Sequence, residues 1–220
     1  MLSAELLPQF LIWGGWLLAF WVLFAVLRGG DWRLMLHVCG SHRFLALSLA
    51  LALLWGLRAN FVPGLSFHLL GVTALTLMLG WRFALLSVAL VLAFVTLYWG
   101  TGWQTYGVNF FLLGLLPVWV CHRLFVFARQ SLPHNFFVYT LFNAFFTAAL
   151  TSLLVVLTAV SLLLVADLEQ YSRLAYEYVP FTPMMLFSEA VFNGLLMTFM
   201  VMVKPAWVSS FSDEVYLHGK

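Results

Sequence analysis

Residues 62–71 read VPGLSFHLLG, a Pro-Gly pair that runs directly into an apolar segment carrying one imidazole. Adjacent Pro and Gly are typical of a turn. The apolar run that follows predicts a membrane-spanning helix that begins close to His68. An ionisable side chain at the start of such a helix either bridges helices by a hydrogen bond or binds a ligand. This stretch alone leaves both interpretations of His68 open.

The composition around this stretch indicates an all-α polytopic membrane protein. Of the 220 residues, 64% are hydrophobic and 8% are charged, which is far outside the range of soluble domains. We expect a single integral membrane domain over residues 1–220 with the lipid bilayer as its surroundings. The net charge of +2 is too small to indicate a nucleic-acid partner. Cys39 and Cys121 have no CxxC spacing and predict neither a redox motif nor a disulfide. The start of the chain lacks a basic signal-peptide region, so we expect the protein to begin at or near Met1.

Apolar runs long enough to cross a bilayer predict about seven transmembrane helices. The predicted spans are 8–28, 43–59, 64–80, 82–99, 108–128, 134–166 and 181–203. The third and fourth must form a tight hairpin at Gly80, and the segment 29–37 predicts a short interfacial helix. With the N-terminus outside and the C-terminus cytoplasmic, all Lys and Arg except Arg58 and Arg173 fall on the cytoplasmic side. This distribution satisfies the positive-inside rule.

Small residues four apart mark one face of the first span. Gly15 and Ala19 predict a close helix contact, either within the chain or with another subunit.

Three polar residues fall toward the outer half of the predicted spans, namely His68, Asn109 and Glu189. A carboxylate inside a bilayer costs about 2.5 to 3.5 kcal/mol on insertion scales, so Glu189 must face the bundle interior and have a partner. Asn193 lies one turn later on the same helix face. Glu189 is therefore predicted either to support a functional site or to hydrogen-bond between helices.

The chemistry of a neutral imidazole suits a nitrogen-rich site for a transition metal. The other histidines fall on the cytoplasmic side, and the spacing of His37, Cys39 and His42 matches no metal motif. Met184 and Met185 precede Glu189, and thioethers either pack in apolar helices or bind Cu(I). No nucleophile triad, phosphate-binding loop or zinc-protease helix is present, so the sequence predicts neither an enzyme nor a covalently bound cofactor.

The ordered motifs resemble a known family of transporters. The stretch at 62–71 is followed by LGWRFALL at 79–86, GVNF at 107–110 and SEA at 188–190. This set is similar, over about residues 58 to 203, to the cobalt and nickel permeases of energy-coupling-factor transporters, the CbiM and NikM type. The resemblance implies a substrate-capture subunit of the bacterial inner membrane. Such a subunit binds a divalent transition metal from outside, with Co and Ni expected before Cu or Zn. It works with a separate transmembrane coupling subunit and ATPase subunits.

The resemblance also implies a site. In the family the N-terminus folds back into the bundle, which makes the Met1 amine and His68 the expected metal ligands. We expect four further residues to support or line the site, namely Asn109, Glu189, Thr182 and Ser66. Leu2 stands where the family has histidine, and Thr182 stands where the last helix usually has another. These departures leave a second interpretation open, a non-transporting membrane subunit that keeps the fold and anchors or assembles a larger complex.

Overall fold

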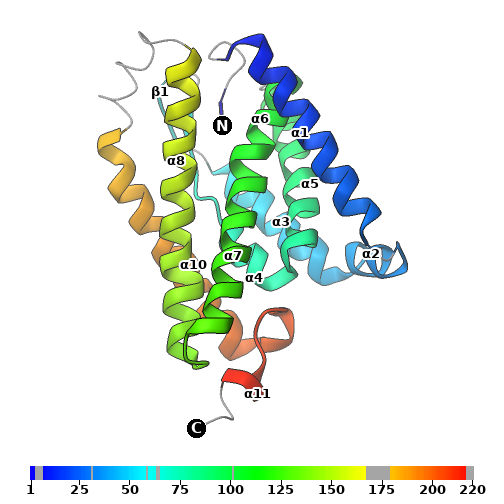
Figure 1. The fold of residues 1–220 in the computed structure, drawn as a ribbon, viewed down its shortest axis with the longest axis vertical. Helices are drawn as coiled ribbons and strands as arrows, with labels where there is room; N and C mark the ends of the chain where they lie inside the picture. The colour runs from blue at the N-terminus through cyan, green and yellow to red at the C-terminus, as the bar shows by residue number, and fades with distance from the viewer. Residues whose placement is uncertain are drawn as a thin grey trace.

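The computed structural model describes residues 1–2, 7–30, 32–57, 59–62, 65–100, 102–166 and 179–216, and these form a helical bundle (Figure 1). The α-helices are α1 (Gln9–Arg28), α2 (Trp32–Cys39), α3 (His42–Gly56), α4 (Val72–Leu79), α5 (Trp81–Trp99), α6 (Tyr106–Phe110), α7 (Leu116–Ser131), α8 (Thr147–Ala166), α10 (Thr182–Val203) and α11 (Asp213–Tyr216). Short 3-10 turns are η2 (Trp103–Thr105), η5 (Val179–Phe181) and η6 (Pro205–Trp207). Two π-helical segments, η3 (Phe111–Leu115) and η4 (Val138–Phe146), continue directly into α7 and α8.

Five helical runs of the described chain are long and apolar enough to cross a membrane, which confirms the polytopic class. They are Gln9–Arg28, Trp81–Trp99, Trp103–Ser131, Val138–Ala166 and Val179–Val203. The apolar helix α3 is shorter, with 15 residues. Residues 32–39 form the short helix expected between the first two spans.

The third predicted span, 64–80, is wrong as a continuous helix. Leu65–Phe67 is β2, which pairs antiparallel with β1 (Ala59–Val62), and this pairing also ends the second span at Gly56 rather than residue 59. The expected turn residues Pro63 and Gly64 lie outside the described residues. Helix begins only at Val72 because Gly71, at φ 63°, turns the chain. The eight residues of α4 then rise about 12 Å, less than half of a bilayer's hydrocarbon core.

Helix α4 lies at the centre of the bundle (Figure 1), and all eight of its residues are buried. Gly80, at φ 81°, is the single residue between α4 and α5, which confirms the predicted tight hairpin. The segment after α10 returns to the end of α4: the backbone N–H of Ser209 donates to the Met78 carbonyl, and that of Ser210 to the Leu77 carbonyl. The residues that follow α10 are therefore bound to the helical bundle.

The face of α1 that carries the small residues packs against another helix of the same chain. A Cβ on Gly15 would lie 2.7 Å from the backbone nitrogen of Val108, and a Cβ on Gly107 would strike the backbone of Gly15. Ala19 is also buried. The glycines allow α1 and α6 to touch backbone to backbone, so Gly15 serves an intramolecular contact.

Candidate metal site

The N-terminus is inserted into the bundle, as the family resemblance implied. The backbone N–H of Leu2 donates to Oδ1 of Asn109 over 2.8 Å, and Nδ2 of Asn109 donates back to the Leu2 carbonyl over 3.0 Å. Asn109 Nδ2 also donates to the Thr105 hydroxyl over 3.2 Å, which fixes the amide plane. The Leu2 side chain is 3% exposed. Asn109 therefore clamps Leu2 by both of that residue's backbone polar groups, its N–H and its carbonyl.

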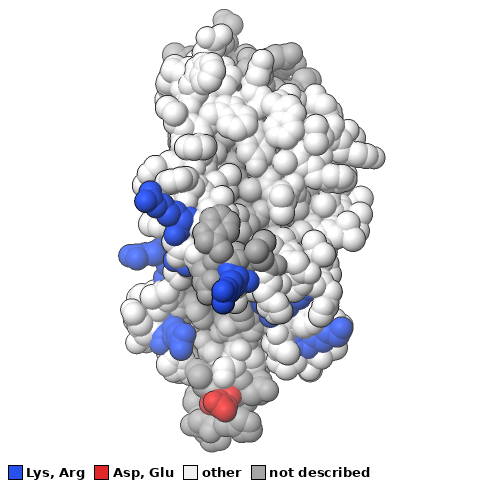
Figure 2. Space-filling model, turned by 90° about the vertical axis from the view of Figure 1, so that its right-hand side faces the viewer, with Lys and Arg blue, Asp and Glu red and all other residues white. Residues whose placement is uncertain are grey.

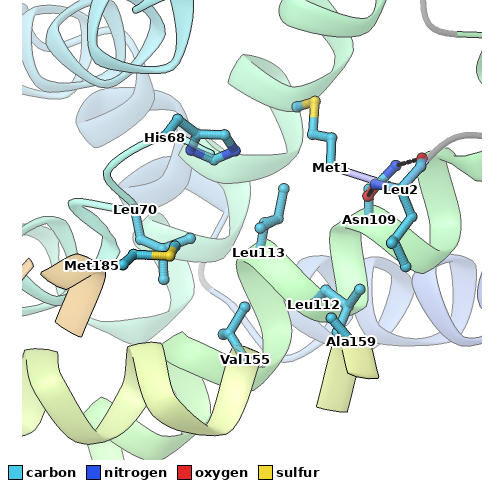
Figure 3. A pocket seen from close by; sticks show the side chains of 10 residues that line it. All are labelled: Met1, Leu2, His68, Leu70, Asn109, Leu112, Leu113, Val155, Ala159 and Met185. Atoms are coloured by element: carbon cyan, nitrogen blue, oxygen red, sulfur yellow. Dashed lines mark hydrogen bonds between the residues drawn. The ribbon is translucent and has the colours of Figure 1, made fainter. Parts of the chain in front are cut away.

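A cavity of about 30 Å³ lies between this clamp and His68 (Figure 3). Its described lining is Met1, Leu2, His68, Leu70, Asn109, Leu112, Leu113, Val155, Ala159 and Met185. In Figure 3 the Met1 side chain extends from the Leu2–Asn109 pair toward the side where His68 lies. One water molecule needs about 10 to 15 Å³ of such space, so the cavity has room for only a few waters and a bound ion would lose most of its hydration shell.

The imidazole of His68 is oriented by the backbone carbonyl of the next residue and by an indole. Nδ1 lies 3.2 Å from the Leu69 carbonyl oxygen. A carbonyl only accepts, so this contact requires the proton on Nδ1 and leaves the lone pair on Nε2, the nitrogen that can bind a metal. The Trp55 ring packs against the imidazole with 5.2 Å between centroids, and its Nε1–H donates to the Leu70 carbonyl over 2.9 Å.

Glu189 holds the segment that carries His68. Its Oε2 accepts the backbone N–H of Leu70 and its Oε1 that of Gly71, each over 2.7 Å. Nδ2 of Asn193 donates to Oε1 over 2.8 Å, and Oδ1 of Asn193 accepts the Ala74 N–H. A carboxylate at this helix N-terminus accepts N–H groups that have no partner within the helix. Glu189 thus acts on His68 through the backbone and is a positioning residue.

The predicted site residues separate into two groups. Met1, His68 and Asn109 line one cavity, whereas Glu189 lies outside the described lining. Ser66 is in β2, paired with Asn60, two residues before His68. Thr182 is buried on α10 with a hydroxyl that finds no partner among the described residues, and it does not appear in the described lining.

Sequence reasoning missed Trp55. It lies one residue before the end of α3, where a tryptophan is ordinarily explained by the membrane interface, so its position in the sequence did not single it out. A buried indole needs an acceptor for its N–H. That requirement is the available signal, but it does not identify Leu70 as the acceptor.

The methionines and the histidines predicted to lie on the cytoplasmic side also have definite positions. Met185 lines the cavity, whereas Met184 is 72% exposed on the outside of the bundle. Within the described residues no group of three or more His, Cys, Asp or Glu side chains forms a metal-binding cluster, and this includes His37, Cys39 and His42. The cavity between Met1 and His68 is lined by side chains that carry nitrogen and sulfur, among them Met185.

Comparison with known proteins identifies the family. No curated protein and no solved structure matches the chain significantly. A family model described as CbiM, cobalt uptake substrate-specific transmembrane region, matches residues 2–207. Because this match covers nearly the whole chain, the protein belongs to the CbiM family of substrate-specific transmembrane components for cobalt uptake, which are transport proteins and not enzymes.

Proposed function

We propose that this protein captures a transition-metal ion in the cavity between Met1 and His68, with the Met1 amine and His68 Nε2 as ligands. The observation that carries the proposal is the insertion of the N-terminus, held by the paired bonds between Leu2 and Asn109. An amine and an imidazole are nitrogen donors that suit first-row transition metals. The clamp keeps the amine near the imidazole before the metal arrives, which lowers the entropic cost of binding.

We propose further that the cavity opens to the outer side and that the C-terminus is cytoplasmic. Figure 2 supports this orientation, because the Lys and Arg side chains drawn in blue lie from about mid-height downward on that face. None of the described ones is seen near its upper end, toward which the N-terminus lies in Figure 1. Among the described residues, Arg43 and Arg82 bond to backbone carbonyls near the inner ends of the helices. Positive charge is enriched on the cytoplasmic side of membrane proteins.

Energy for release comes from partner subunits in this proposal. The sequence contains no phosphate-binding loop, so the chain cannot use a nucleotide by that motif. The family places such a chain with a transmembrane coupling subunit and ATPase subunits. These partners would reorient the bundle and release the metal inward.

The test is metal uptake by cells that express the chain with its partner subunits, together with cobalt binding by the purified chain. His68→Gln and a Gly-Ser extension ahead of Met1 should each weaken binding by about tenfold or more, since each removes or displaces one ligand. His134→Gln is the matched control, because His134 is an exposed imidazole at the other end, bonded to the Arg129 carbonyl. Binding that is equal in all four proteins would refute the proposal.

A second function is favoured by the apolar residue at Leu2 and by Thr182, where the family has histidines. In this alternative the chain is a non-transporting subunit that anchors or assembles a larger membrane complex. It predicts that His68→Gln leaves uptake unchanged and that the chain co-purifies with proteins other than coupling and ATPase subunits.

A further inference from the structure

A groove lies between α1, α5 and α7, apart from the cavity at His68. Its volume is about 350 Å³, compared with about 30 Å³ for the cavity at His68. Eleven described residues line it; they are mostly apolar, none is acidic, and two are His122 and Arg123. The groove is therefore apolar in one part and basic in another.

The packing of α1 explains why the groove exists. Helix α1 touches the backbone of α6 at Gly15, and in Figure 1 it inclines away from the other helices toward its lower end. The side chains that α1 presents to the groove are mostly small, namely Val22, Ala25 and Val26. The borders Trp21 and Trp119 are 66% and 59% exposed, so the groove opens to the lipid around the bundle.

The lining changes from apolar to basic along the helical run that ends in α7. Leu115 and Val118 come first, and His122 and Arg123 follow on the same side. From Leu115 to Arg123 the helix rises about 12 Å, close to the hydrocarbon thickness of one leaflet, about 15 Å. Trp81, the first residue of α5, has its ring centroid 5.9 Å from that of His122. Tryptophan is enriched at the membrane interface, which places the basic end at the level of the lipid headgroups.

Arg123 has no counter-charge in the described part of the chain. Its guanidinium makes no hydrogen bond or ion pair with a described residue, whereas those of Arg43 and Arg82 bond to backbone carbonyls. Arg82 also lies 5.1 Å from the Trp81 ring, which adds a second positive charge beside the groove. A guanidinium at the edge of a membrane needs an anionic partner, and it binds phosphate through two parallel hydrogen bonds.

We propose that this groove binds an anionic phospholipid, with an acyl chain between α1 and α7 and the phosphate at Arg123 and His122. Basic pockets between transmembrane helices recognise anionic headgroups in this way. A zwitterionic lipid carries its own cation beside the phosphate, so a site with positive charges and no acidic side chain favours a lipid of net negative charge. The bound lipid fills the gap between α1 and α7 and thereby ties α1 to the bundle.

The experiment is native mass spectrometry of the purified full-length chain in detergent. The chain is titrated with phosphatidylglycerol and with phosphatidylcholine that have identical acyl chains. Arg123→Gln removes the charge from the groove. Arg129→Gln is the matched control, because Arg129 is exposed on the same helix and does not appear in the described lining.

A second pair of variants tests the apolar part of the groove. Ala25→Phe places a large side chain where the acyl chain would lie and changes no charge. Ala46→Phe is the control, at an exposed position of α3 outside the described lining. Both alanines are exposed, so neither substitution overpacks the core of the bundle.

We expect phosphatidylglycerol to bind the unsubstituted chain more tightly than phosphatidylcholine. Arg123→Gln should weaken phosphatidylglycerol binding by about fivefold and leave phosphatidylcholine binding unchanged, while Arg129→Gln changes neither. Added salt should reduce the preference for phosphatidylglycerol, because it screens the charges. Ala25→Phe should weaken the binding of both lipids, and Ala46→Phe should weaken neither.

Two outcomes overturn the inference. If the two lipids bind equally, or if Arg123→Gln behaves like Arg129→Gln, the basic end recognises no headgroup. If Ala25→Phe leaves lipid binding intact but abolishes co-purification with a coupling subunit, the groove is a protein interface and not a lipid site. No metal enters these measurements, so their failure leaves the proposed metal capture standing, and failure of metal capture leaves this inference standing.

Discussion

The two ends of α4 are both held by distant parts of the chain, but by opposite chemistry and in different surroundings. At its N-terminal end, called the outer end after the proposed orientation, Glu189 and Asn193 accept backbone N–H groups, and these side chains are 1% and 0% exposed. At its C-terminal end, called the inner end in the same sense, Ser209, Ser210 and Arg43 donate to the carbonyls of Leu77 and Met78. Ser209 is exposed and Arg43 is partly exposed.

The difference shows where the fold has no substitute for a lost partner. Both ends match the polarity of the helix, with acceptors at its N-terminus and donors at its C-terminus. Water can replace a lost donor at the inner end, whereas the interior of the bundle near Glu189 offers none. The outer end is therefore expected to be sensitive to substitution and the inner end tolerant.

The largest effect is expected for Glu189→Leu. This change leaves the N–H groups of Leu70 and Gly71 without their acceptor, whereas Asn193 Nδ2 keeps its bond to the backbone carbonyl of residue 189. Each buried group left without a partner costs about 1 to 3 kcal/mol. We expect a loss of stability of about 3 kcal/mol or more, measured by unfolding in detergent or lipid, and a loss of metal binding because the His68 segment is released. Phe187→Leu, at an exposed position of the same helix, is the control. A stability equal to that of the control would show that the outer end is not held by Glu189.

A smaller loss of stability is expected for Asn109→Leu, with a large effect on binding. The substitution removes both bonds to Leu2, at a cost of about 1 to 3 kcal/mol. The first residues should leave the bundle, so the Met1 amine should become reactive toward a water-soluble acylating reagent. Asn109→Asp keeps the acceptor for the Leu2 N–H and loses the donor to the Leu2 carbonyl, and it should fall in between. An amine that stays protected in Asn109→Leu would contradict the clamp.

The paired substitution Ser209→Ala with Ser210→Ala tests the inner end. It removes hydroxyl bonds to the Leu77 carbonyl and the bond between Ser210 and Tyr139, but both backbone N–H bonds remain. We expect a loss of about 1 to 2 kcal/mol and unchanged metal affinity. A loss larger than that of Glu189→Leu would reverse the proposed ranking of the two ends.

The smallest effect is expected for Arg43→Gln. The guanidinium donates to the carbonyls of Met78 and Ala206, at a position where water can take over both acceptors. We expect a change of about 0.5 to 1 kcal/mol in unfolding free energy. A change of several kcal/mol would indicate that the inner end is closed to water.

The membrane class and the long helices were predictable because apolar runs such as Val138–Ala166 need no partner to define them. The tight hairpin at Gly80 was predictable for the same local reason. The absence of helix at residues 65–71 was not predictable, because it depends on Glu189, which lies 118 residues from Gly71 in sequence. The Glu189 carboxylate accepts backbone N–H groups that have no helical partner. A hydropathy pattern depends only on the residues of one segment and carries no information about a partner that is distant in sequence.

The site was predictable in part. His68 and Asn109 stood out as polar residues in apolar surroundings, and the family resemblance predicted that Met1 lies near them. The support of His68 by Trp55, and the difference between Met184 and Met185, depend on which way neighbouring helices turn. Adjacent residues on a helix point about 100° apart, so the sequence could not tell which methionine faces the cavity.

The backbone contact between Gly15 and Gly107 has a consequence for release. It fastens α1 to α6, and α6 carries Asn109 and, through it, the first two residues. The imidazole belongs to another unit, because its segment is fastened to α10 through Leu70 and Glu189. In the proposed function, the ion would lie between α6, which holds the N-terminus, and α10, which holds the His68 segment. A motion that separates α6 from α10 would then move the amine away from the imidazole and release the ion.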